Sequence, residues 1–202
     1  MFSRSQFDTA CKAYVSKHNK WTWHEHSTFP GFGYMSRTTI QTMRSPINCL
    51  DEQLEGSSAL DNIDEATAPI GIDVLTSQQY VIFSATFQVP TFYFTVHDAK
   101  GVPLSLYDIL RSTLFRRFAF TGVERSNHAL TLPGSSFPLL SQGDHPTLGT
   151  PCWYLHPCAT AKAVGELMAE QQGKMEEEEE ILLKTLETWV LVVRQVVDWG
   201  RE

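Results

Sequence analysis

The chain has 202 residues, a formal net charge of -7 and 42% apolar residues. A chain of this length buries about 70% of its unfolded surface, so one domain can fold without disulfide or metal staples. The acidic balance argues against a nucleic-acid partner, whose affinity would come from lysine and arginine on phosphates. No apolar leader follows Met1, so we expect a cytoplasmic protein whose four cysteines are free thiols.

Local signals predict the elements of the first half in chain order. Ser3 and Gln6 form a capping box, which predicts a helix from about residue 4 to 18. Apolar and polar residues then alternate in three segments, which predicts strands at about 20–26, 32–43 and 80–96. Pro90 interrupts the last of these and indicates a bulge, a sheet edge or two separate strands.

The second half reads as helices separated by loop. A helix is expected to begin at Ser105, and residues 121–150 are rich in Gly, Pro, Ser and Asn, which predicts a loop. Two further helices are expected at about 160–172 and 175–199. The last is amphipathic and too charged to span a membrane, so we expect no integral membrane association. This order of elements predicts an α+β fold with an antiparallel sheet.

Acidic residues concentrate in two places. Residues 45–99 contain eight acidic side chains and no lysine or arginine, most densely from Asp51 to Asp73. We therefore expect one domain over residues 1–202 with a flexible acidic insertion at about 48–73. The run Glu176–Glu180 is expected to be solvated at a helix start, where its charge suits the helix dipole.

Cys158 has the most distinctive setting of the four thiols. Pro157 fixes its own φ and favours an extended His156, so the chain is stiff just before the cysteine. The following residues read as helix, and the exposed N–H groups and dipole at a helix N-terminus favour a thiolate. A nearby imidazolium would do the same. A nucleophilic thiol is therefore one reading, and a small buried apolar residue is the other.

Other chemistries find less support. The spacing of His145, Cys152, His156 and Cys158 matches no common metal-ligand pattern, so we expect no metal. A cysteine hydrolase could draw its base from one of several histidines, but no papain-like or caspase-like signature surrounds Cys158. No glycine-rich phosphate loop is present, so we expect no nucleotide cofactor.

Four ordered blocks resemble the autophagy-related protein 10 family, which contains ubiquitin-conjugating (E2-like) enzymes. They are Phe87–Phe94, Gly101–Ile109, His145–Pro151 and Leu155–Thr160. The resemblance extends over residues 79–160, and the helix around Trp189 is similar to the C-terminal helix of the family. Residues 1–45 agree only loosely. The resemblance implies an E2-like fold, an antiparallel sheet flanked by helices.

The resemblance also implies a thioester relay. The E1-like autophagy-related protein 7 would pass autophagy-related protein 12 to Cys158, which matches the catalytic cysteine of the family. A lysine of autophagy-related protein 5, docked by strand addition at a sheet edge, would then attack the thioester. Pro90 marks one candidate edge for that docking.

Three further residues gain candidate roles from the resemblance. His156 stands where some members carry asparagine, and it either donates a hydrogen bond to the oxyanion or holds the turn. Tyr93 matches a tyrosine on the strand near the cysteine, where it orients residue 156 or the lysine, or is a core residue. Asp144 either assists the lysine or is a solvated turn residue.

Two related readings stay open at this point. The chain resembles autophagy-related protein 3 in its His-Pro-Cys block, and that family transfers a different modifier to a lipid amine. A non-catalytic adaptor that binds autophagy-related protein 5 would keep the fold without needing an intact Cys158.

Overall fold

The computed structural model describes residues 1–26, 28–29, 31–44, 74–170 and 177–200. The predicted acidic insertion at 48–73 and Cys49 lie outside the described residues. The fold is α+β with an antiparallel sheet, as predicted. The strands are β1 (Thr22–His24), β2 (Tyr34–Thr42), β3 (Val74–Ser84), β4 (Val89–His97), β5 (Glu124–Arg125), β6 (Ala129–Thr131), β7 (Pro138–Asp144) and β8 (Pro151–Leu155). The helices are α1 (Arg4–Lys17), α2 (Leu106–Arg111), α3 (Pro157–Glu170) and α4 (Glu178–Val193).

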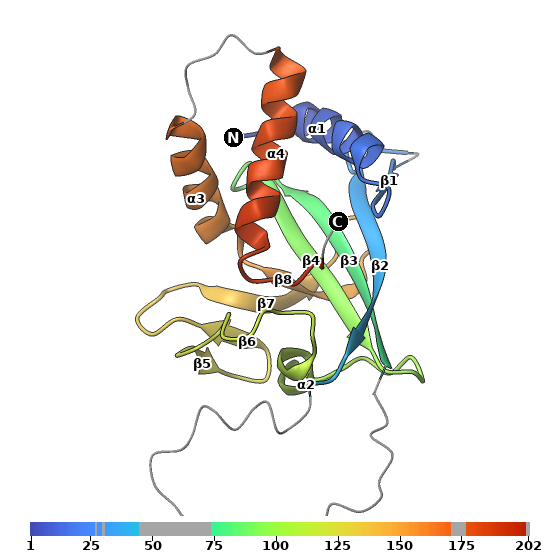
Figure 1. Cartoon of the computed structure of the whole chain (residues 1–202), viewed down its shortest axis with the longest axis vertical. Coiled ribbons are helices and arrows are strands. Elements are labelled where there is room, and N and C mark those ends of the chain that lie inside the picture. Colours follow the sequence, from blue (N-terminus) through green and yellow to red (C-terminus); the bar gives the residue numbers. More distant parts are fainter. Residues whose placement is uncertain (27, 30, 45–73, 171–176, 201–202) are drawn as a thin grey trace, which may run out of the picture.

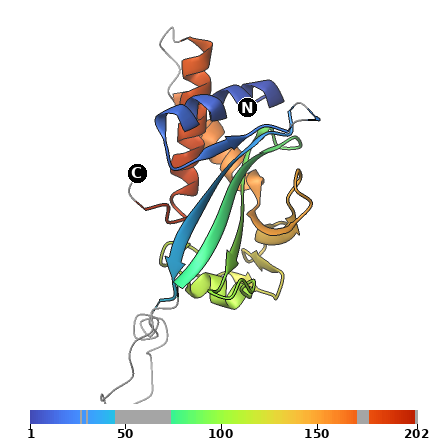
Figure 2. The ribbon, with the colours of Figure 1, turned by 90° about the vertical axis from the view of Figure 1, so that its right-hand side faces the viewer.

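The strands form one sheet in the order β1-β2-β3-β4-β8-β7-β6-β5. Helices α1, α3 and α4 gather at one end, whereas α2 and the β5–β6 hairpin lie toward the other (Figure 1). The long strands β2, β3 and β4 connect the two ends (Figure 2). Because β4 pairs with β8, the sheet brings the segment before Cys158 against the centre of the fold.

Helix α1 begins where the sequence predicts, because both hydrogen bonds of the Ser3–Gln6 capping box form. Its buried face packs on α4 and on the sheet. The core between them consists of aromatic and aliphatic side chains, among them Phe7, Tyr14, Phe92, Phe94, Leu186 and Trp189. Spanning a bilayer takes about 20 consecutive apolar residues, and no helix among the described residues meets that requirement.

The predicted strand at 80–96 is two strands joined by a turn over residues 85–88. The N–H of Gln88 closes the turn on the carbonyl of Ser84 at 2.8 Å. Of the three readings of Pro90, two separate strands is confirmed, but the break lies before the proline. Pro90 pairs with Phe83 of β3, whereas β4 pairs with β8 only at Tyr93 and Phe94, so Pro90 has a strand partner on one side. The outermost strands of the sheet are β1 and β5.

The prediction that residues 121–150 form a loop is wrong. The segment contains β5, β6 and β7, and β7 pairs with β8 from Leu140↔Leu155 to Asp144↔Pro151. The last helix is also shorter than predicted, since α4 ends at Val193 and a turn follows. Its buried apolar residues are Leu183, Leu186, Trp189, Val190 and Val193, so the helix is amphipathic as predicted.

Candidate active site

Cys158 is the second residue of α3, because the helix begins at Pro157 and not near residue 160 as predicted. Proline suits the first helical position, where its missing N–H would have no intrahelical partner. Cys158 is partly exposed, whereas Cys11 and Cys152 are buried. Among the described residues it is therefore the thiol that another protein can reach.

The free N–H groups at the start of α3 have identifiable partners. His156, at the N-cap, donates its N–H to the carbonyl of Leu139 at 2.9 Å. The N–H of Cys158 donates to Nδ1 of His156 at 3.4 Å, a long N-cap bond. Pro157 has no N–H, so Ala159 supplies the remaining N–H group of this first turn. Ala159 directly follows Cys158 in the chain and lies in the same helical turn.

The electrostatic settings of the described thiols differ. Burial raises the pKa of Cys11 well above its ordinary value, and burial also raises that of Cys152. Both therefore stay protonated at neutral pH and are poor nucleophiles. The first turn of α3 contains no acidic residue, so no carboxylate there opposes a thiolate at Cys158.

His156 is held in one neutral form. Burial lowers its pKa below the ordinary 6.5, so the imidazole is uncharged at neutral pH. Because Nδ1 accepts the N–H of Cys158, the ring proton is assigned to Nε2. Both roles of His156 stay predictions, since the N-cap bond suits a residue that holds the turn and the Nε2–H is left as a donor.

Within the described part of the chain, Tyr93 is linked to His156 by ring contacts through Tyr154. It pairs with Tyr154 across β4 and β8, and the two rings stack with centroids 5.2 Å apart. The Tyr154 ring in turn lies 6.5 Å from that of His156. Burial is the main cause that raises the pKa of Tyr93 to about 12, so its phenol stays protonated.

Two other residues of the region that resembles the family, Asp144 and His145, lie away from Cys158. Asp144 pairs with Pro151, at the opposite end of β8 from Cys158, so it fits the reading of an exposed turn residue. His145 is buried, its Nδ1 accepts the N–H groups of Thr147 and Leu148, and burial lowers its pKa to about 4. In the described part of the chain, no three His, Cys, Asp or Glu side chains gather to hold a metal ion.

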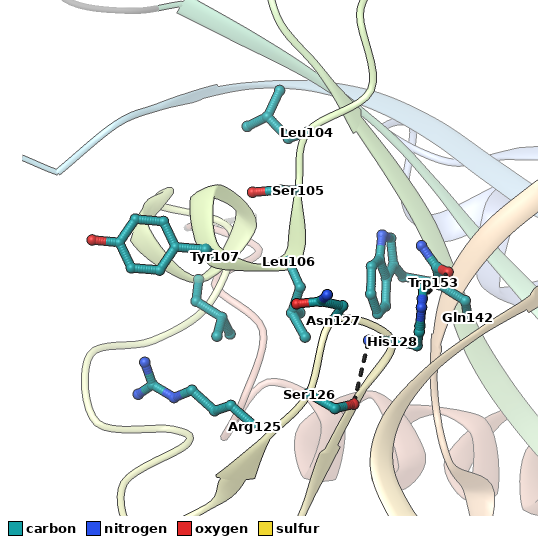
Figure 3. Close-up of a pocket in the computed structure, with 11 residues that line it drawn as sticks. Leu104, Ser105, Leu106, Tyr107, Arg125, Ser126, Asn127, His128, Gln142 and Trp153 are labelled. Carbon is teal, nitrogen blue, oxygen red and sulfur yellow. Dashed lines mark hydrogen bonds between the residues drawn. The ribbon is translucent and has the colours of Figure 1, made fainter.

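A cavity of about 440 Å³ lies elsewhere, between α2, the β5–β6 hairpin and β8. Figure 3 shows Leu106 and Trp153 on its apolar side and Arg125 and His128 among its polar groups. Cys158 does not line it. The candidate site at Cys158 is thus a separate surface.

The sequence assigns no site role to two residues that contact His156, although Phe87 begins the first of the matched blocks. Phe137 stacks on the imidazole with ring centroids 5.4 Å apart, and Phe87 contacts it edge-on at 5.2 Å. Phe87 lies in the unpredicted β3–β4 turn and Phe137 in the segment predicted as loop. Only the strand pairing brings them to His156.

Comparisons with known proteins identify the family of the chain. A family model described as "Autophagocytosis associated protein, active-site domain" matches residues 6–201. A human protein named ubiquitin-like-conjugating enzyme ATG10 is 24% identical over 182 residues, which are 82% of this chain and 77% of that protein. A protein of the same name from Arabidopsis thaliana is 30% identical over 58% of this chain and 47% of its own length. One from Dictyostelium discoideum is 30% identical over 43% of this chain and 34% of its own length.

Proposed function

The chain belongs to the autophagocytosis associated protein family, as an ATG10-type ubiquitin-like-protein transferase with an E2-like fold, and on that premise we propose that Cys158 carries the modifier as a thioester. The main support is the position of Cys158, an accessible thiol in the first turn of α3. The three named relatives share the ATG10 name, which favours this reading over lipid conjugation. In this proposal residues 1–202 act as one conjugating domain in the cytoplasm.

Loading would be a thiol exchange. The Cys158 thiolate attacks the thioester carbonyl that joins autophagy-related protein 12 to a cysteine of the E1-like autophagy-related protein 7. The new carbon–sulfur bond forms as the bond to the E1 cysteine breaks, and that sulfur leaves as a thiolate. One thioester replaces another, so the acyl group keeps its reactivity.

Transfer would move the acyl group to an amine. A lysine of autophagy-related protein 5 loses one proton, attacks the thioester carbon and forms a tetrahedral oxyanion. The Cys158 thiolate then leaves and the nitrogen releases its second proton, which completes an isopeptide bond. The N–H of Ala159 and the Nε2–H of His156 are the two donors that we propose for the oxyanion.

The Cys158→Ser variant tests this chemistry. Incubated with the E1-like enzyme, the modifier and ATP, the wild type is expected to form an adduct that a reducing thiol removes. The serine variant should form it more slowly as an oxyester that survives the thiol, because an alcohol is a poorer nucleophile and leaving group. Cys152→Ala is the matched control and should behave as wild type. A thiol-sensitive adduct on Cys158→Ser would contradict the proposal.

His156→Ala separates the two roles of His156. We expect transfer to the acceptor to slow about 10- to 100-fold, while loading of Cys158 changes by no more than about twofold. His156→Asn should keep most of the rate, since an amide can both cap the helix and donate. Single-turnover kinetics of each step measure this. Equal losses in loading and transfer would mean that His156 acts only on the structure.

Tyr93 has an indirect role in the same proposal. Its ring stacks on Tyr154, which lies between it and His156. Tyr93 would therefore orient residue 156 by fixing the Tyr154 ring, and its protonated phenol would bring no charge to the site.

A further inference from the structure

The imidazole of His156 contacts two phenylalanines that come from distant parts of the chain. The Phe137 ring is nearly parallel to it, at an interplanar angle of 22°, and the Phe87 ring is nearly perpendicular, at 77°. Phe137 is 58% exposed, so burial in the core does not account for this side chain. Among the described residues, the ring that Phe137 contacts is the His156 imidazole.

Hydrogen bonds to the backbone hold the segments that carry Phe87 and Phe137 in place beside His156. The turn that carries Phe87 is closed by Gln88 on Ser84, and the carbonyl of Gln88 accepts the N–H of Phe2 at 2.9 Å. The Ser135 hydroxyl donates to the carbonyl of Phe137 at 2.8 Å. Two residues beyond Phe137, the carbonyl of Leu139 accepts the N–H of His156. The segment that carries Phe137 is thus tied to the backbone of the residue that its ring covers.

Ring orientation matters because the two nitrogens of His156 have different tasks. Nδ1 accepts the N–H of Cys158, which leaves the proton on Nε2. A half-turn of the ring would place a carbon against that N–H and redirect the Nε2–H. A stacked aromatic ring restrains this rotation, because the rotated imidazole would lose the favourable contact between the two ring faces.

We infer that Phe137 is a positioning residue for acyl transfer, which acts by holding the imidazole of His156 in the orientation that offers Nε2–H to the thioester on Cys158. This inference rests on the proposed function of Cys158. Phe87 contacts the same imidazole edge-on, and Phe137 is the exposed ring that a substitution can remove without opening the core.

Solvent exclusion gives the inference a second consequence. The titratable side chains beside His156 are Tyr154 and Cys158, and burial alone causes the lowering of its pKa. Removal of the Phe137 ring exposes the imidazole, so its pKa rises toward 6.5. Protonation makes Nδ1 a donor, which cannot accept the N–H of Cys158. The pH below which the transfer rate falls should therefore be higher in this variant.

The test compares Phe137→Ala with Phe137→Tyr, which keeps the stacked ring. A control is Phe118→Ala, which removes a phenylalanine of similar exposure, 60%, from the loop after α2. Single-turnover loading and transfer are measured from pH 6 to 8, and the His156 imidazole is titrated by NMR.

For Phe137→Ala we expect the transfer rate at pH 7 to fall about 3- to 10-fold with the loading rate unchanged. The transfer profile and the His156 titration should both move to higher pH. Phe137→Tyr and Phe118→Ala should match the wild type.

Two outcomes would overturn the inference and leave the proposed function standing. One is wild-type transfer by Phe137→Ala with an unchanged His156 titration. The other is an equal loss of loading and transfer, which would make Phe137 a residue of the fold. Failure of the wild type to form an adduct on Cys158 would instead refute the proposed function, so the two failures are distinguishable.

Discussion

Cys158→Ala is expected to abolish both the thiol-sensitive adduct and the conjugate on the acceptor. A methyl group has no nucleophilic atom, so the loss should exceed about a thousandfold and reach background. The side chain is partly exposed, so its removal leaves no cavity in the core, and alanine is well tolerated in a helix. The free energy of unfolding should therefore change little. Gel assays of loading and of transfer, with thermal unfolding as a check, measure these quantities.

Cys152→Ala is the matched control for this change. Cys152 is 3% exposed within β8, so its truncation leaves a small cavity and should lower stability while both reactions persist. Conjugate formation by Cys158→Ala at a rate similar to that of Cys152→Ala would mean that the acyl group does not pass through Cys158.

Trp189→Ala is expected to lower the free energy of unfolding by about 3–5 kcal/mol. The side chain is fully buried on α4 and contacts Trp199 at a centroid distance of 6.2 Å. Trp199 also contacts Trp21 and Phe92, so the cavity would open where α4 meets the sheet. For a domain of this size the melting temperature should fall by about 10 °C. Calorimetry or denaturant titration measures the loss.

Two variants on the same helix define the scale of this effect. Trp189→Phe should cost much less, because it keeps a ring and removes an indole N–H that is buried without a partner among the described residues. Leu191→Ala should change stability by no more than about 0.5 kcal/mol, because Leu191 is 58% exposed. If Trp189→Ala lowered the free energy of unfolding as little as Leu191→Ala, the described packing of α4 on the core would be contradicted.

The sequence predicts the elements that carry their own local signals. The capping box at Ser3 and the Ser105 cap locate α1 and α2 because each depends on neighbouring residues. The β3–β4 turn carries no such signal. Gln88 occupies a positive φ of 55°, where glycine or asparagine would have indicated the turn. Strands β5 and β6 are two and three residues long, and they depend on pairing with their neighbours rather than on local pattern.

The candidate site likewise contains residues that local sequence predicts and residues that it does not. Pro157 and the helix that follows point to Cys158 and His156, because all of them lie within a few residues. The N-cap bond of His156 could be predicted only in part, since it depends on where α3 begins. Phe137 and Phe87 lie 19 and 69 residues before His156, and the sheet topology alone brings them together. Similarly, the antiparallel register places Asp144 at the far end of β8, which its nearness in sequence does not reveal.

A pulse-chase of the adduct tests the central claim most directly. The wild type is loaded with the modifier, the E1-like enzyme is then stopped by removing ATP, and the acceptor is added. If Cys158 carries the acyl group, the thiol-sensitive adduct should decay at the rate at which the conjugate appears, one for one. Peptide mapping by mass spectrometry should place that adduct on Cys158. An adduct on another residue, or conjugate that forms while the Cys158 adduct persists, would contradict the account.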